Sequence, residues 1–165
     1  PPREYTSDRP VELALTSGVR LLVGGNRLPF YDLAYELAWR VGQEYERILK
    51  QEITFSRAET CTQLVDFLSE MDAHPTPLLV TDLLSRFYAE ADRHVDQLFF
   101  ACQIELHRLS QDCPIFVSAN PKPPLERLGH VLARISREFN PHSIHNLKGN
   151  NHGPYTATLF PSIQK

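Results

Sequence analysis

Short apolar runs alternate with amphipathic helical patterns along most of this 165-residue chain. The runs at 19–24, 77–84 and 113–121 are rich in Val, Leu and Ile, which is typical of strands buried on both faces. Residues 52–57 alternate apolar and polar side chains and predict a fourth strand. Because strands and helices alternate, the sequence predicts an α/β domain whose mostly parallel sheet is flanked by helices on both faces.

Helical patterns lie between the predicted strands. The first predicted helix begins near Pro29 and runs to about residue 49, since apolar residues recur there at helical spacing: Leu33, Leu37, Val41, Tyr45 and Ile48. A second helix is predicted to begin at Thr60 or Thr62. Two more are predicted over 95–109 and from Pro123 to Asn140, where Asn-Pro ends the pattern.

The tail has two strand-like runs on either side of 148–154, KGNNHGP, which is a hairpin signal. It predicts an antiparallel C-terminal hairpin at the edge of the sheet. The length fits one domain, so we expect a single domain over 1–165, with residues 1–18 as an N-terminal extension or the remnant of a lost unit.

The composition is that of an ordinary globular protein, with 42% hydrophobic and 22% charged residues. A net charge of -3 disfavours a large basic nucleic-acid surface but allows a local basic patch. Cys61, Cys102 and Cys113 form no CxxC pair and sit in or beside apolar runs, as buried reduced thiols do. No apolar run reaches the roughly 18 residues of a membrane span, and no signal peptide is visible. We therefore expect a cytoplasmic or nuclear protein with no membrane partner.

The run LLVTD, which ends at Asp82, has the form of a Walker B strand. A carboxylate at the carboxyl end of a buried parallel strand can face a ligand crevice and bind Mg²⁺ directly or through water. The pattern is short and common in α/β domains, so a structural or capping aspartate is the alternative that it favours.

The turn Gly24, Gly25, Asn26 and Arg27 lies between a strand and a helix, where a phosphate loop would lie. No GxxxxGK[ST] motif occurs in the sequence. The turn offers only Arg27 as a cation, and Pro29 has no N–H to donate to a phosphate. A strand-to-helix turn with glycines at positive φ is the favoured interpretation.

Two other chemistries receive little support. His142, His145 and His152 are close in sequence, but no carboxylate or cysteine completes a metal site, and hairpin surface residues are the favoured interpretation. Ser118 lies outside any GxSxG elbow, which disfavours acyl transfer. We expect no metal and no other cofactor.

A mild basic bias marks the C-terminal part of the chain, and it comes from Lys122, Arg127, Arg134, Arg137 and Lys148. Such residues often form a solvated helix face. Lys122, Arg127 and Lys148 are nevertheless candidate contacts to DNA phosphates.

The order of segments over 19–161 resembles the core of the RecA-like recombinases, especially the archaeal and eukaryotic strand-exchange proteins and their paralogues. VGGNRLPFYDLAYELA is similar to a strand, a Thr-Glu-Gly-type turn and a helix of that family. ITFSRAETCTQLVDFL is similar to its next strand and helix, and LLVTDLLSRFYAEA to its Walker B strand with the apolar and aromatic stretch that follows. LHRLSQDCPIFVSANP, RLGHVLARI and HNLKGNNHGPYTATLFP are similar to the later segments.

The resemblance implies a RecA-like domain that has lost its ATPase machinery. The Walker A unit would lie before residue 19, where it is missing or reduced to VELAL at 11–15. The catalytic glutamate of the family would fall on the GGN turn, which has no carboxylate. The segments matching the two DNA-binding loops, 89–94 and 120–125, are short.

The implied function is that of a non-catalytic recombinase paralogue, a pseudo-ATPase that acts through protein contacts in DNA recombination or repair. Its expected partner is a related RecA-like subunit or a second copy, with weak binding of single- or double-stranded DNA. Two alternatives stay open. One is a P-loop ATPase whose Walker A motif lies upstream, in which Asp82 would bind Mg²⁺. The other is a RecA-like regulator without a P-loop, such as the bacterial cell-division inhibitors of that fold.

Overall fold

The structure, a computed structural model, describes residues 8–25, 30–89, 94–120, 122–139 and 155–159. Within these ranges five strands form one sheet in the order β2-β1-β3-β4-β5. The strands are β1 (Val19–Val23), β2 (Ile53–Arg57), β3 (Leu78–Thr81), β4 (Ile115–Ala119) and β5 (Tyr155–Leu159).

The first four strands are parallel, and β5 is antiparallel to β4. This confirms the predicted α/β fold with a mostly parallel sheet. Residues 140–154, which contain most of the predicted C-terminal hairpin, lie outside the described residues. Of that hairpin, the structure describes β5 alone.

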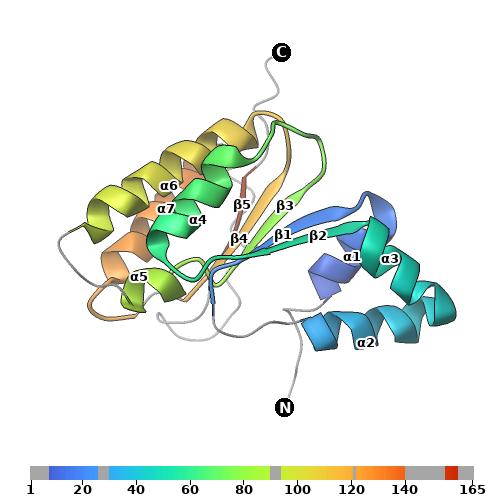
Figure 1. Cartoon of the computed structure of the whole chain (residues 1–165). Coiled ribbons are helices and arrows are strands. Elements are labelled where there is room, and N and C mark those ends of the chain that lie inside the picture. Colours follow the sequence, from blue (N-terminus) through green and yellow to red (C-terminus); the bar gives the residue numbers. More distant parts are fainter. Residues whose placement is uncertain (1–7, 26–29, 90–93, 121, 140–154, 160–165) are drawn as a thin grey trace.

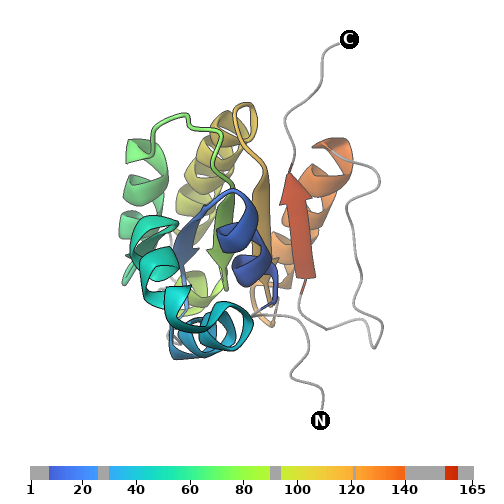
Figure 2. The same cartoon turned by 90° about the vertical axis from the view of Figure 1, so that its right-hand side faces the viewer.

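Helices flank both faces of the sheet, as Figures 1 and 2 show. One face carries α1 (Asp8–Thr16), α2 (Phe30–Val41) and α3 (Tyr45–Gln51). The other carries α4 (Cys61–Glu70), α6 (Val95–Ser110) and α7 (Glu126–Phe139), with the short α5 (Ser85–Ala89) after β3. No helix in the described ranges is long and apolar enough to cross a membrane.

Alternate residues of the buried strands serve the two layers. Leu21 and Val23 face the core under α1 and α2, whereas Leu22 faces the core under α4 and α6. In β3, Leu79 belongs to the first core and Val80 to the second. These strands are therefore buried on both faces, which explains their continuous apolar sequences.

The direction of the connections reverses after β2. The chain passes from β1 outward to β2, and it then returns past β1 to β3 and β4. Because crossovers between parallel strands are right-handed, this reversal places the two groups of helices on opposite faces. It also creates a switch point between β1 and β3, and ligands of open α/β sheets bind beside the carboxyl ends of such strands.

The predicted single helix over 29–49 is wrong. The chain forms α2, a 3-10 turn at Gly42–Glu44 and then α3. Gly42 adopts a φ of +61°, which a helix interior does not allow. The apolar spacing continues across this break because both helices pack on the same face of the sheet.

The helix α4 begins at one of the two threonines that were predicted as its N-cap. The side chain of Thr60 accepts a hydrogen bond from the backbone N–H of Gln63 at 3.1 Å, so Thr60 is the N-cap and Thr62 is not. The helix α1 was not predicted from the apolar pattern. It packs Val11 and Ala14 into the core beside β1.

Candidate functional site

The turns after β1 and β3 meet at the switch point of the sheet. The backbone N–H of Gly24 donates to the carbonyl of Thr81 at 2.9 Å. A Cβ at Gly24 would lie 2.8 Å from the carbonyl oxygen of Asp82. A Cβ at Gly25 would lie 3.0 Å from the Cβ of Asp82 and closer still to its carboxylate.

Glycine is thus required at both positions because Asp82 approaches the backbone of this turn closely. Positive φ is recorded at Gly18 and Gly42, and neither Gly24 nor Gly25 has it. The expectation that the GG pair serves a positive-φ turn is therefore wrong. Asn26 and Arg27, the rest of the predicted turn, lie outside the described residues.

Asp82 itself has the unusual backbone conformation, with a φ of 53°. Its N–H donates to the Oγ of Ser118 at 3.0 Å, and its carbonyl accepts from the N–H of Ser85 at 3.1 Å. Aspartate is one of the few residues that adopt this left-handed conformation readily. Asp82 therefore forms the turn from β3 into α5, and its side chain is exposed at the switch point.

Ser118 acts as a structural partner of this turn. Its hydroxyl accepts from Asp82, and its carbonyl accepts from the N–H of Leu83 at 2.9 Å. The side chain and backbone of one β4 residue thus hold the end of β3.

Arg86 of α5 ties together the ends of β1 and β2, a role that the sequence interpretation missed. Its side chain is 8% exposed. The Nε donates to the carbonyl of Ala58 at 2.8 Å, and Nη2 donates to the carbonyl of Gly25 at 3.2 Å. A cation within the apolar and aromatic stretch LLSRFY is the signal that could have revealed it.

Three residues lie side by side at the carboxyl ends of β2, β1 and β3, on the α2 side of the sheet. Arg57 pairs in register with Val23, and Val23 pairs with Thr81. The Nε of Arg57 and the Oγ1 of Thr81 are buried and have no hydrogen-bond partner within the described ranges. This end of the sheet is therefore more polar than the apolar strands that lead to it.

Asp82 would supply a single carboxylate to a bound metal ion. Mg²⁺ prefers six oxygen ligands and usually takes one or two carboxylates together with water or phosphate. No group of three or more His, Cys, Asp and Glu side chains that could hold a metal occurs in the described part of the chain. His142, His145 and His152 fall outside that part.

Two of the three candidate DNA contacts can be placed. Lys122 is exposed, and its backbone is joined to Tyr88: the tyrosine hydroxyl donates to the carbonyl of Lys122 at 2.7 Å and also accepts from its N–H. Burial raises the pKa of Tyr88. Tyr88 immediately precedes 89–94, and Lys122 lies within 120–125, the two segments that the resemblance matches to DNA-binding loops. Lys148 lies outside the described residues.

Arg127 is held by neighbouring groups. Its Nη2 donates to both carboxylate oxygens of Asp96, at 3.1 and 3.2 Å, and its Nη1 donates to the carbonyl of Pro124 at 3.1 Å. The ion pair joins α7 to the first turn of α6. Asp96 offsets the charge that Arg127 would offer to a phosphate.

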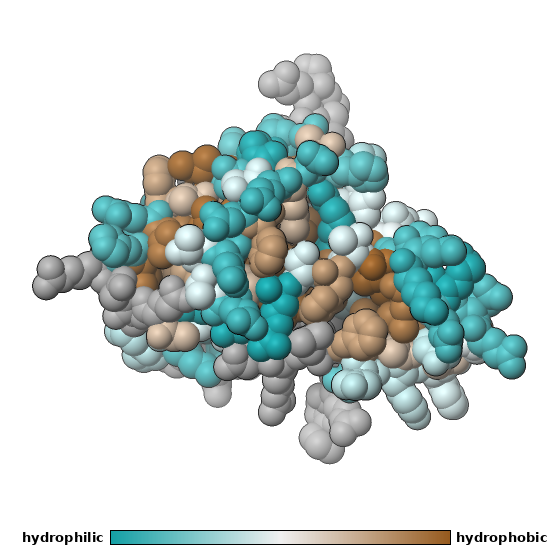
Figure 3. Space-filling model, viewed as in Figure 1, coloured by the Kyte–Doolittle hydropathy of each residue, from teal (hydrophilic) through white to brown (hydrophobic). Residues whose placement is uncertain are grey.

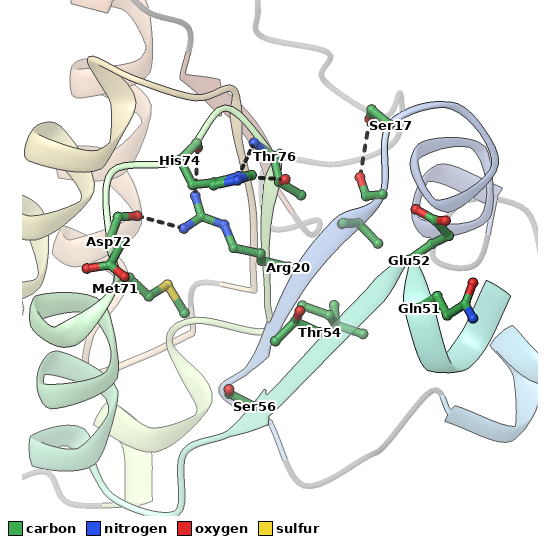
Figure 4. Close-up of a pocket in the computed structure, with 13 residues that line it drawn as sticks. Ser17, Arg20, Gln51, Glu52, Thr54, Ser56, Met71, Asp72, His74 and Thr76 are labelled. Atoms are coloured by element: carbon green, nitrogen blue, oxygen red, sulfur yellow. Dashed lines mark hydrogen bonds between the residues drawn. The ribbon is translucent and has the colours of Figure 1, made fainter. Parts of the chain in front are cut away.

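A hollow of about 430 Å³ lies near the amino ends of β1 and β2, away from the turns that follow β1 and β3 (Figure 4). Arg20 donates to the carbonyls of Asp72 at 2.9 Å and His74 at 3.3 Å, and to the Sγ of Cys113 at 3.1 Å. The guanidinium thus anchors the segment after α4. Other lining residues include Gln51, Glu52, Thr54, Ser56, Met71 and Thr76.

The three cysteines are free thiols and buried, which confirms that prediction. Burial raises the pKa of Cys102 to about 12. Such a thiol stays protonated at neutral pH and is a weak nucleophile.

No protein-family model matches the chain, and no curated protein matches it significantly in sequence. The class that the fold defines is an α/β domain with a parallel sheet between two layers of helices.

Proposed function

We propose that this chain is a RecA-like domain without ATPase activity, which acts through protein contacts as an accessory subunit in DNA recombination or repair. Two things support the proposal: the order of segments that resembles the recombinase core, and the α/β fold with a Walker B-like aspartate at its switch point.

The contact between the two turns carries the non-catalytic part of the proposal. The resemblance puts the water-activating glutamate of the family on the turn that begins with Gly24 and Gly25. A side chain at Gly24 would meet the backbone of Asp82, and one at Gly25 would meet its carboxylate. A glutamate at Gly24 would clash with that backbone, and one at Gly25 would require the Asp82 side chain to move. ATP hydrolysis would thus lack water activation as well as the lysine of a Walker A motif.

A nucleotide test separates this proposal from the ATPase alternative. We expect no rise in the thermal unfolding temperature on addition of excess Mg-ATP, because a ligand stabilises only a folded state that binds it. The matched variant is Asp82→Asn, which keeps the size of the side chain and removes its charge. A Mg²⁺-dependent stabilisation of the wild type that is lost in Asp82→Asn would overturn the proposal and identify a magnesium-nucleotide site.

The DNA contribution is expected to be weak, since Lys122 is exposed but Arg127 is paired with Asp96. Titration of single-stranded DNA should give an affinity that falls as salt rises, and Lys122→Glu should weaken it. Lys50→Glu on α3 is the control, because it makes the same charge change at an exposed lysine of the other helical layer. Equal affinities for Lys122→Glu and Lys50→Glu would remove Lys122 from the DNA-binding surface.

The accessory role has its own test. The protein is isolated from its native cell after cross-linking, and the proteins attached to it are identified. We expect a RecA-like, ATP-binding subunit among them. Cross-linking only to proteins of cell division would favour the regulator alternative.

A further inference from the structure

The strand β2 forms an open edge of the sheet. It pairs with β1 on one side, and no other described strand lies along its second side. Among the described helices, α3, which leads directly into β2, is the only one that packs extensively against it. Figure 1 looks onto this edge, and β2 runs there between the two layers of helices with no described helix in front of it. The hydrogen-bonding groups on the second side of β2 are therefore open to another strand.

The free backbone groups belong to alternate residues of β2. The carbonyl of Glu52 accepts from the N–H of Val19 at 2.8 Å, and the N–H of Ala58 donates to the carbonyl of Val23 at 3.0 Å. The even-numbered residues over 52–58 thus turn their backbone groups toward β1, because these groups alternate in direction along a strand. The N–H and C=O groups that point away from β1 are those of Ile53, Phe55 and Arg57.

The strand lacks the common features that prevent edge pairing, which are proline, lysine, a bulge or a covering segment. Its sequence, ITFSR, contains neither proline nor lysine, and its register with β1 is continuous from Ile53 to Arg57. Thr54 is exposed, and the other four residues are partly exposed. In Figure 3, which shows the same side of the molecule, pale and brown side chains lie over β2. The one charge within the strand is that of Arg57, at its end.

The sequence of β2 is complementary to itself in an antiparallel pair. When two copies are centred on Phe55, all five residues of each strand are paired, with Ile53 opposite Arg57 and Thr54 opposite Ser56. The outward-facing residues then form the hydrogen-bonded pairs, which gives about six backbone hydrogen bonds between the copies. Other registers pair fewer residues of β2, and the register centred on Arg57 sets two arginines against each other.

The side chains suit the same register. Thr54 and Ser56 oppose each other on the face that carries the hollow, where both residues line open space (Figure 4). Phe55 opposes its own copy on the other face, beside the core under α3. Hydroxyl pairs and aromatic pairs both stabilise antiparallel strands. No like charges are opposed within the paired strands, because Arg57 lies opposite Ile53.

We propose that β2 is a self-association edge, through which two copies of this chain form a symmetric dimer with one continuous sheet and Phe55 on the two-fold axis. A row of alternating backbone donors and acceptors is satisfied by an extended strand, and the self-complementary sequence identifies that strand as β2 of a second copy. The proposal goes beyond the proposed function, because it commits this edge to a second copy. The nucleotide and DNA results do not bear on it.

The association and its location can both be measured on the full chain. Sedimentation velocity should show a monomer–dimer equilibrium that shifts toward the dimer as the concentration rises. Amide hydrogen exchange, followed by NMR at low and high concentration, should show slower exchange in the dimer at Ile53, Phe55 and Arg57. The amides of Thr54 and Ser56 are the internal control, because they face β1 in both states.

Two results would overturn the proposal. A monomer at every concentration would leave this edge to a strand of another protein. A dimer in which the amides of Ile53, Phe55 and Arg57 exchange as fast as in the monomer would place the interface elsewhere.

Two matched double variants test the register. Thr54→Glu/Ser56→Glu sets like charges opposite each other at both cross-strand positions, whereas Thr54→Glu/Ser56→Lys sets unlike charges there. We expect the dimer dissociation constant of the first variant to be about tenfold higher than that of the second. In a register centred on Thr54 or on Ser56, the second variant would also oppose like charges and would lose this advantage.

The control for net charge is Gln97→Glu/Gln111→Glu, which adds as many negative charges as the first variant does, at exposed positions near the two ends of α6. It should dimerise as the wild type does. Circular dichroism and urea unfolding check that each variant keeps its fold. Equal dissociation constants for the two matched variants, in folded proteins, would exclude the antiparallel β2 pair centred on Phe55.

Discussion

Gly24 lies directly against the backbone of Asp82, so that a Cβ at position 24 would be 2.8 Å from the Asp82 carbonyl oxygen. That oxygen is fixed, because it accepts from the N–H of Ser85. We expect Gly24→Ala to lower the free energy of unfolding by about 1–3 kcal/mol, as overpacking does. Urea denaturation measures the change.

Gly25→Ala should be less costly, because the added methyl group meets the Asp82 side chain, which can rotate. Asp82→Gly removes that side chain and suits the φ of 53° at this position. In a double-mutant cycle we expect Asp82→Gly to relieve the cost of Gly25→Ala and to leave that of Gly24→Ala unchanged. Additive effects at both glycines would show that the carboxylate does not occupy the space over Gly25.

The sequence located these two turns but not the contact between them. VGG and LLVTD each indicated a strand end, because an apolar run met a glycine or an aspartate. Their proximity depends on the strand order, in which β3 returns to lie beside β1. Local patterns contain no such information, so the glycines were assigned to positive φ when the cause was crowding across the sheet.

Arg86 should contribute strongly to stability. Its guanidinium donates to the carbonyls of Ala58 and Gly25 in a buried position. We expect Arg86→Met to cost about 2–4 kcal/mol, since it leaves buried acceptors without their donors. Arg47→Met, at an exposed arginine of α3, should change stability by less than about 0.5 kcal/mol. Similar unfolding midpoints for the two variants would mean that water replaces the Arg86 hydrogen bonds.

Gly42 differs from Gly24 in the reason for its glycine. Nothing lies within 4 Å of a Cβ built at Gly42, but the φ of this residue is +61°. Gly42→Ala should cost about 1–2 kcal/mol from the left-handed backbone alone. Gly42→Asn should cost less, because asparagine tolerates this conformation. Thermal unfolding of the two variants gives the order, and an alanine variant as stable as the asparagine variant would contradict it.

The break at Gly42 also shows where periodicity misleads. Leu33 and Leu37 in α2 and Ile48 in α3 all pack into the same core. Their spacing fits one helix, although a 3-10 turn separates the two. A glycine followed by polar residues was the local sign of an interruption, and the continuous apolar pattern outweighed it.

The thiol of Cys102 should make stability depend on alkaline pH. Burial raises its pKa from 9.0 to about 12 in the folded protein, so between these values the unfolded chain loses a proton that the folded one retains. Ionisation then favours the unfolded state, and the stabilising effect of the neutral thiol is complete below pH 9 and lost as pH rises toward 12.

Cys102→Ala lacks this group and isolates its effect from the tyrosines and lysines that titrate in the same range. We expect the wild-type free energy of unfolding to fall more steeply with pH than that of Cys102→Ala, by up to about 1.4 kcal/mol per pH unit. Urea denaturation in a reducing buffer at successive pH values gives both slopes. Parallel curves would contradict this expectation, because they would mean that the thiol ionises as readily in the folded core as in the unfolded chain. Burial away from water should prevent that.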